Sequence, residues 1–322
     1  MTAQRTGTAD ITNVNSFYDR DLLFRAQPFL THTRFGQVKD IPTGNSFVIK
    51  FKRYGNFAVA TTPLVEGVSP LGKKLSETII TATAAQYGDF VTLTDKLTMS
   101  TADPVRMEAN SILGDQAGNT LDQLTRDILA ASTNVIYSGT GNVANADVAA
   151  GDIITLANIQ SAEETLKANN TRYMTSFVDP STGYNTVPLA PCFVGICHVY
   201  TTKTIRAMTG FTKVELYANP AARMEGEFGK IENTRFIETV NGKVFTAAGT
   251  SSIDVYGTII MGQQAYGISR IAGHAMENIV KPLGSGGTSD PLNQRETSGW
   301  KASFVAKILN DDFLVRIVHA RV

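Results

Sequence analysis

The chain has 322 residues, of which 43% are hydrophobic and 18% are charged, and its 29 Lys and Arg residues balance its 29 Asp and Glu residues. This length can form one large domain or two linked domains with a sizeable core. A net charge of zero argues against a protein that binds nucleic acid through its phosphates, because such binding needs a basic excess. A charged fraction below the usual value of about 25% indicates either a large core or a surface that other subunits cover.

Neither a signal sequence nor a membrane span is expected. The N-terminus, Met-Thr-Ala-Gln-Arg-Thr, has no apolar signal core, and no stretch approaches the roughly 18 apolar residues of a membrane span. The two cysteines, Cys192 and Cys197, lie in one apolar run, and in a strand their spacing of five would put them on opposite faces, unable to pair. Buried free thiols fit a protein that folds in the cytoplasm rather than a secreted disulfide scaffold.

The first third of the chain predicts a helix followed by a long hairpin. Apolar residues recur every four positions in 14–27, which predicts a helix that ends at Pro28. Residues 46–54 alternate between apolar and polar, and 77–85 are rich in Thr and Ile, so both segments are expected to be strands. The segment between them, 61–75, is rich in Pro and Gly and predicts a broad tip. A further strand is expected at 88–95.

The strongest helical pattern lies in residues 104–137. Its apolar stripe repeats at spacings of four and three: Ala117, Leu121, Leu124, Ile128, Ala131 and Val135. Asp103 is a suitable N-cap, and Pro104 suits the first helical position. At a rise of about 1.5 Å per residue such a helix would be roughly 50 Å long, which predicts an extended spine with other elements packed across it.

The rest of the chain predicts a mixture of short helices and strands. Small residues at 139–151 indicate a loop and a domain boundary. The expected elements after it are a helix at 155–168, a buried strand at 192–200, a short helix near 202–208, and strands at 226–240, 243–248 and 253–260. The alternating residues 300–308, a turn at 310–312 and the return through 313–322 predict a C-terminal hairpin.

The sequence offers no pattern for catalysis or for metal binding. The histidines lie far apart and in no metal-ligand spacing: His32, His198, His274 and His319. Glu225 and Glu227 could be a carboxylate pair, but general acid and base residues usually come from separate elements, so a solvated turn is the preferred interpretation. We therefore expect no enzyme, with no catalytic, cofactor-binding or metal-binding residues.

Several segments, in order along most of the chain, resemble the major capsid proteins of tailed bacteriophages with the Hong Kong 97-type fold. The similarity is to the branch of that family that lacks a long N-terminal propeptide. The matching segments are Thr-Pro-Leu-Val-Glu-Gly-Val-Ser-Pro at 62–70, Gln-Tyr-Gly-Asp-Phe-Val at 86–91, Asp-Lys-Leu at 95–97, Gly-Glu-Phe-Gly-Lys-Ile at 226–231, Thr-Arg-Phe-Ile-Glu-Thr at 234–239, Tyr-Gly-Thr at 256–258, Gly-Gln-Gln-Ala-Tyr-Gly at 262–267, Asp-Pro-Leu-Asn-Gln at 290–294 and Gly-Trp-Lys at 299–301.

The resemblance implies an α+β fold with five parts. An N-terminal arm would comprise residues 1–43, and an extended β-hairpin loop that lies over a neighbouring subunit would comprise 44–86. A peripheral domain at 87–149 would contain the spine helix 104–137. An axial domain would follow at 150–255, and residues 256–322 would return to the peripheral domain and end in the C-terminal hairpin.

The resemblance also implies a function: self-assembly into the hexamers and pentamers of an icosahedral phage head that encloses double-stranded DNA. The implied partners are copies of the chain itself, a separate scaffolding protein, a portal, a decoration protein, and packaged DNA bound without sequence specificity, with no membrane. The protein would be located in the virion after assembly in the host cytoplasm. The alternative is an encapsulin-like compartment or another phage structural subunit.

A long hairpin is costly for a lone molecule, because its edges and apolar tip stay uncovered. We therefore expect it to contact an adjacent copy. The candidate subunit-interface residues are Arg53, Pro63, Leu64, Glu66, Val68, Pro70, Lys73, Lys74 and Glu77. The alternative for each charged residue among them is a solvated loop side chain.

Overall fold

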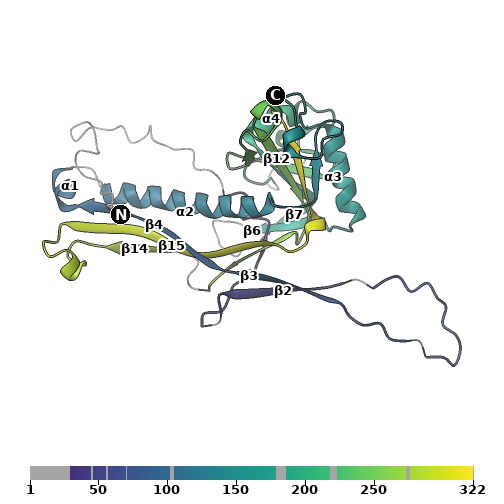
Figure 1. Ribbon diagram of the computed structural model, residues 1–322, viewed down its shortest axis with the longest axis horizontal. Coiled ribbons are helices and arrows are strands. Elements are labelled where there is room, and N and C mark those ends of the chain that lie inside the picture. The colour runs from purple at the N-terminus through teal and green to yellow at the C-terminus, as the bar shows by residue number, and fades with distance from the viewer. Residues whose placement is uncertain are drawn as a thin grey trace.

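A computed structural model describes residues 30–44, 46–55, 57–69, 71–101, 105–178, 186–217, 223–272 and 276–321. The helix expected at 14–27 and the expected cap and first turn at 103–104 lie outside these residues. The described chain has an α+β fold in which a long helix crosses a sheet, a second sheet forms a compact body at one end, and a hairpin projects from the side (Figure 1).

The elements in chain order are β1 (Gln37–Val38), β2 (Val48–Tyr54), β3 (Glu77–Thr83), β4 (Ala85–Thr94), α1 (Asp95–Ser100), α2 (Val105–Leu129), β5 (Val135–Tyr137), α3 (Leu156–Ala168), β6 (Met174–Val178), β7 (Thr186–His198), α4 (Val199–Arg206), β8 (Thr212–Lys213), β9 (Glu227–Ile231), β10 (Thr234–Thr239), β11 (Lys243–Phe245), β12 (Val255–Met261), β13 (Tyr266–Arg270), β14 (Glu277–Lys281), β15 (Arg295–Ile308) and β16 (Leu314–His319). The predicted strands of the hairpin and the predicted helix at 155–168 are confirmed to within a few residues.

Helix α2 lies along one face of a five-stranded sheet, which we call the spine sheet. Its strand order is β1-β13-β15-β14, and β4 pairs with the other edge of β15. Leu113 and Ala117 of α2 pack against Trp300 and Ala302 of β15. Successive side chains of a strand point to opposite faces of the sheet, so the residues on the face opposite to α2 are not covered by this helix.

The compact body is built on a nine-stranded sheet of order β5-β16-β12-β7-β10-β9-β8, to which β11 and β6 add. Its central strand β7 sends alternate side chains into two separate cores. Cys192 and Val194 belong to one core, and Phe193 and Cys197 belong to the other. Both cysteines are free and buried, as their spacing predicts.

The predicted spine helix is too long by about two turns at its C-terminal end. Helix α2 ends at Leu129, and the chain enters strand β5 at Val135. The Ser132 hydroxyl and the Thr133 backbone N–H donate hydrogen bonds to Asp311, which stabilises the non-helical turn. The apolar repeat continues to Val135 because β5 also packs on the core. The repeat therefore predicts a continuation of the helix, although Val135 lies in a strand.

The predicted C-terminal hairpin is wrong. Strand β15 lies in the spine sheet, whereas β16 pairs with β12 and β5 in the nine-stranded sheet. The backbone N–H groups of Leu309 and Asn310 donate to the carbonyl of Ala265, and this turn directs the chain into the other sheet. Alternation predicted both strands, but it does not specify their partners. Strands β5, β12 and β16, which come from segments assigned by sequence to the peripheral domain or its border, thus pair with the body of the expected axial domain.

The solvated turn predicted around Gly226 is also wrong in part. The Glu227 side chain is fully buried and makes an ion pair with Arg235, which is 6% exposed. Glu225 is 53% exposed and makes an ion pair with Arg34 of the chain before β1. The two carboxylates therefore face different partners and do not form a catalytic pair.

Candidate assembly surfaces

The hairpin is anchored at its base by an apolar cluster. Strands β2 and β3 pair antiparallel from Val48 opposite Thr83 to Tyr54 opposite Glu77. Ile49 and Phe51 of β2 are buried with Ala82 of β3, and partly buried residues of the spine sheet and its flanks pack against them. The alternation of β2 thus fixes one face of the ribbon on the molecule.

Beyond this base the hairpin has no core. Every described residue from 52 to 79 is exposed, and Leu64 and Leu71 are 79% and 98% exposed. The large apolar side chains that it exposes are Tyr54, Phe57, Val59, Leu64, Val65, Val68, Leu71, Leu75 and Ile79. Figure 1 shows this segment extending away from the rest of the molecule. Exposed apolar surface of this extent is typical of sites where proteins bind a partner.

The candidate interface residues lie on this exposed segment. Arg53, Pro63, Leu64, Glu66, Val68, Lys73, Lys74 and Glu77 are all exposed, and Pro70 lies outside the described residues. Two of the charged residues already have partners within the hairpin. The Lys73 ammonium donates to the Ala58 carbonyl at 2.8 Å, and Glu77 lies 2.9 Å from Lys52. These two contacts tie the two limbs of the hairpin together.

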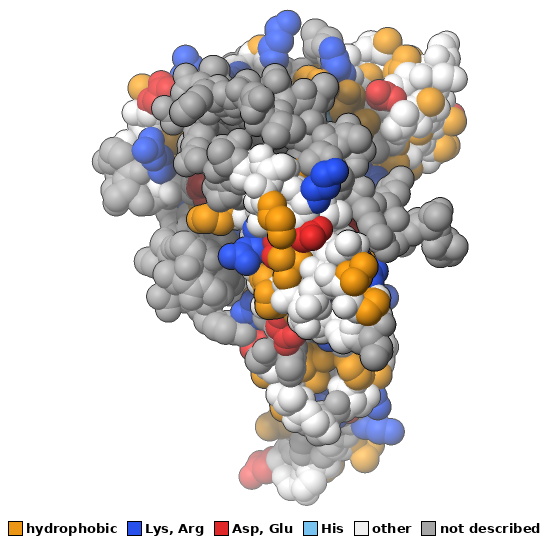
Figure 2. All heavy atoms as spheres, turned by 90° about the vertical axis from the view of Figure 1, so that its left-hand side faces the viewer, with side chains coloured by type: hydrophobic (Ala, Val, Ile, Leu, Met, Phe, Trp, Pro, Cys, Tyr) orange, Lys and Arg blue, Asp and Glu red, His pale blue; other side chains and the backbone are white. Residues whose placement is uncertain are grey.

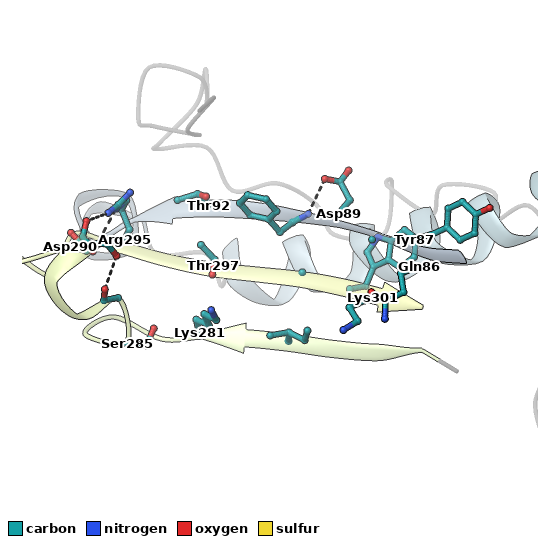
Figure 3. A pocket seen from close by; sticks show the side chains of 17 residues that line it. Gln86, Tyr87, Asp89, Thr92, Lys281, Ser285, Asp290, Arg295, Thr297 and Lys301 are labelled. Carbon is teal, nitrogen blue, oxygen red and sulfur yellow. Dashed lines mark hydrogen bonds and ion pairs between the residues drawn. The ribbon is translucent and has the colours of Figure 1, made fainter. Parts of the chain in front are cut away.

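A second surface, the open face of the spine sheet, carries a shallow groove of about 860 Å³ (Figure 3). Along β4, Gln86, Gly88 and Phe90 face the groove. Asp89, on the opposite face, accepts a hydrogen bond from Gln116 of α2 at 2.7 Å. The groove therefore lies on the face of the sheet that α2 does not cover.

Two glycines form the floor of this groove. A Cβ atom at Gly88 would lie 2.6 Å from the Trp300 carbonyl oxygen, and one at Gly299 would lie 2.6 Å from the Cβ atom of Phe90. The close approach of β4 and β15 thus requires glycine at both positions, and the missing side chains leave the surface hollow.

The walls of the groove are apolar and its rim is basic. Phe90 is 65% exposed and Ile279 is 40% exposed, and Lys281 and Lys301 stand at the rim (Figure 3). Arg295, at the far end, is held by Asp290 at 3.8 Å. Figure 2, which looks onto this end of the molecule, shows hydrophobic side chains at the surface beside charged ones. Sequence reasoning missed this surface; the only signal for it was the run Gly88-Asp89-Phe90, which places a glycine and a phenylalanine on one face of the strand.

The described residues contain no group of three or more His, Cys, Asp or Glu side chains that could hold a metal ion. Burial raises the pKa of the Cys192 thiol to about 11 and also raises the pKa of Cys197, which keeps both thiols protonated and poorly nucleophilic. None of the helices within the described ranges is long and apolar enough to cross a membrane.

Comparison with known proteins identifies the family. A model of the phage capsid protein family matches residues 77–317, which include α2, all strands of the spine sheet except β1, and nearly all of the nine-stranded sheet. The chain belongs to the phage capsid protein family. The match covers most of the chain and does not favour an encapsulin-like compartment. No curated protein matches the chain.

Solved structures support the fold of this capsid protein. The capsid of Ralstonia phage GP4 is similar with a TM-score of 0.69 at 15% identity, covering 100% of this chain and 99% of that one. The capsid of cyanophage Pam1 has a TM-score of 0.66 at 15% identity, covering 100% and 99%. The head structure of Helicobacter pylori bacteriophage KHP40 has a TM-score of 0.65 at 11% identity, covering 100% and 98%. The protein is thus a major capsid protein with the Hong Kong 97-type α+β fold, and it belongs to the virion capsid.

Proposed function

We propose that this capsid protein builds an icosahedral phage head by placing the exposed part of its hairpin on the open face of the spine sheet of an adjacent copy. The observation that carries the proposal is the run of apolar side chains between Tyr54 and Ile79, which no part of the described chain covers. The groove between Phe90 and Ile279 supplies a complementary surface, since it is apolar, shallow and floored by backbone.

A contact between a hairpin on one copy and a groove on the next is head-to-tail. Head-to-tail contacts close into rings when the rotation between neighbours allows it. In rings of six and of five copies, the hexamers and pentamers of an icosahedral shell, each hairpin would bind the groove of the next copy. The division of the chain into an arm, a hairpin loop, a peripheral domain and an axial domain remains a prediction within this proposal.

The packaged molecule in this proposal is double-stranded DNA, held without sequence specificity. A net charge of zero supports a wall that tolerates DNA rather than one that binds it tightly. The role is structural, without catalytic activity, and assembly takes place in the host cytoplasm. A separate scaffolding protein, a portal and a decoration protein complete the proposed set of partners.

Deleting residues 61–75 tests this function. The expected product is a soluble subunit that forms no closed shells, because the base of the hairpin keeps its own apolar cluster while the tip is lost. Electron microscopy and sedimentation of purified protein would measure the outcome. Normal shells from the deletion would refute the proposal.

Point variants give a finer test. Leu64→Asp in the tip and Phe90→Asp in the groove should each reduce shell yield, because both side chains would be buried on assembly. Val143→Asp is the matched control, since Val143 is 79% exposed in a loop outside both surfaces. Equal shell yields from all three variants would show that neither surface is part of the contact.

A further inference from the structure

Strand β14 is an edge strand at the margin of the spine sheet (Figure 1). Its inner edge pairs antiparallel with β15, from Glu277 opposite Lys301 to Lys281 opposite Thr297. No strand in the described part of the chain pairs with its outer edge. An edge of this kind presents a row of backbone donors and acceptors that another strand can join.

This edge carries only part of the usual protection against pairing, because its charged residues, Glu277 and Lys281, stand at the two ends of the strand. The strand contains no proline and shows no register shift against β15. Ile279 and Val280, which point to opposite faces of the sheet, are 40% and 41% exposed. Soluble proteins protect such an edge with charged residues, a bulge, a proline or a covering segment. The only one of these that the described β14 shows is its two terminal charges, and those charges can pair with a second copy of the strand.

The sequence of β14, Glu-Asn-Ile-Val-Lys at 277–281, is complementary to itself in the antiparallel direction. When two copies pair about Ile279, the isoleucine lies opposite its own equivalent. Glu277 then lies opposite the partner's Lys281, and Lys281 lies opposite the partner's Glu277. Opposite charges at directly opposed positions stabilise a strand pair, and like charges destabilise it.

We infer that β14 joins two copies of this capsid protein across a two-fold axis, so that two spine sheets form one continuous sheet. The inference rests on the proposed function, in which hairpin and groove close rings and a further contact must link one ring to the next. Two-fold contacts, in which the same patch serves both partners, are the commonest way for identical subunits to associate. Ile279 and Lys281 of β14 also line the groove. The edge contact would form through the outer backbone edge of β14, whereas the hairpin would lie on the open face of the sheet, so the two contacts approach this strand from different directions.

A single cysteine at the centre of the strand tests the inference. Ile279→Cys would place two thiols opposite each other across the axis. Directly opposed residues of an antiparallel pair have Cα atoms roughly 4.5–5.5 Å apart, within the range of a disulfide. Both native cysteines are buried, so a crosslink would report the introduced thiol. Mild oxidation of assembled shells should convert most of the variant to covalent dimers, whereas the control Val143→Cys should yield few.

Charge reversal is a second test of the two-fold contact. Lys281→Glu and Glu277→Lys each replace two opposite-charge pairs by two like-charge pairs, and each should lower the dimer yield of the cysteine variant about fivefold or more. The double reversal restores the opposite-charge pairs between copies and should recover the dimer yield. It would not recover the yield if the single variants acted through Lys301, which lies opposite Glu277 within one copy.

The outcomes separate the two proposals. Intact shells that give no Ile279→Cys dimer would overturn the two-fold contact and leave the hairpin contact standing. Failure of the unmodified protein to form shells under any condition would instead refute the proposed function.

Discussion

Replacing Glu227 with Gln should destabilise the isolated subunit by about 3–5 kcal/mol, because it leaves a buried guanidinium without its counter-charge. The carboxylate accepts hydrogen bonds from Arg235 Nε at 2.6 Å and from a terminal guanidinium nitrogen at 2.5 Å. It also accepts from the Tyr217 hydroxyl at 2.7 Å and from the Met224 backbone N–H at 2.9 Å. Burial by itself would lower the pKa of Arg235, but Glu227 is the largest of the groups that raise that pKa above its ordinary value, so this carboxylate is the main stabiliser of the buried cation.

Thermal unfolding of the unassembled subunit, followed by circular dichroism, measures the effect. A chain of 322 residues should have an unfolding entropy of about 0.7 kcal/mol/K near 60 °C, so the expected loss corresponds to a fall in Tm of about 4–7 °C. Glu238→Gln is the control in the same sheet. Glu238 is 36% exposed and lies 3.9 Å from Arg206, so that variant should lose no more than about 1 kcal/mol. Equal melting temperatures for the two variants would refute the assignment of Glu227 and Arg235 as a buried ion pair.

Three further predictions follow from buried groups. Burial lowers the pKa of His319 from 6.5 to about 4, so the free energy of unfolding should fall by about 3 kcal/mol as the pH falls from 6.5 to 4. In His319→Gln, the midpoint of urea unfolding should depend less on pH across this range. An unchanged pH dependence would contradict the burial of the neutral ring. Cys192 and Cys197 should react with a thiol reagent only after unfolding, and rapid labelling of the native subunit would contradict their burial. Gly195→Ala should lower the free energy of unfolding by about 1–3 kcal/mol, because the added Cβ would lie 2.7 Å from the Phe236 ring. The control Gly114→Ala, on α2 with open space around it, should raise the free energy of unfolding by up to about 1 kcal/mol. Equal effects of the two variants in chemical denaturation would contradict this packing.

Local patterns in the sequence predicted most of the elements. The alternation of residues 46–54 predicted β2 (Val48–Tyr54), and the stripe from Ala117 to Ile128 predicted the second half of α2. These elements follow from the side-chain period of a strand or a helix, which a single segment carries in full. The exposed tip at 61–75 was predicted as well, because Pro and Gly exclude regular structure there.

The pairing of strands could not be predicted in the same way. The sequence around Asn310 has the composition of a hairpin turn, yet β15 and β16 enter different sheets. Pairing depends on contacts between segments far apart, such as Leu309 with Ala265, and no short window contains that information. The buried Glu227 was missed for the same reason, since its partner Arg235 becomes visible only when β9 pairs with β10. The groove and the edge of β14 likewise exist only once the spine sheet is assembled.

The most direct test of the hairpin as an assembly device is a cryo-electron microscopy reconstruction of shells formed by the purified protein. The expected density shows the segment between Tyr54 and Ile79 of each copy lying across Phe90 and Ile279 of its neighbour. Density in which this segment folds back onto its own copy would contradict the proposal, and so would shells in which the groove faces solvent throughout.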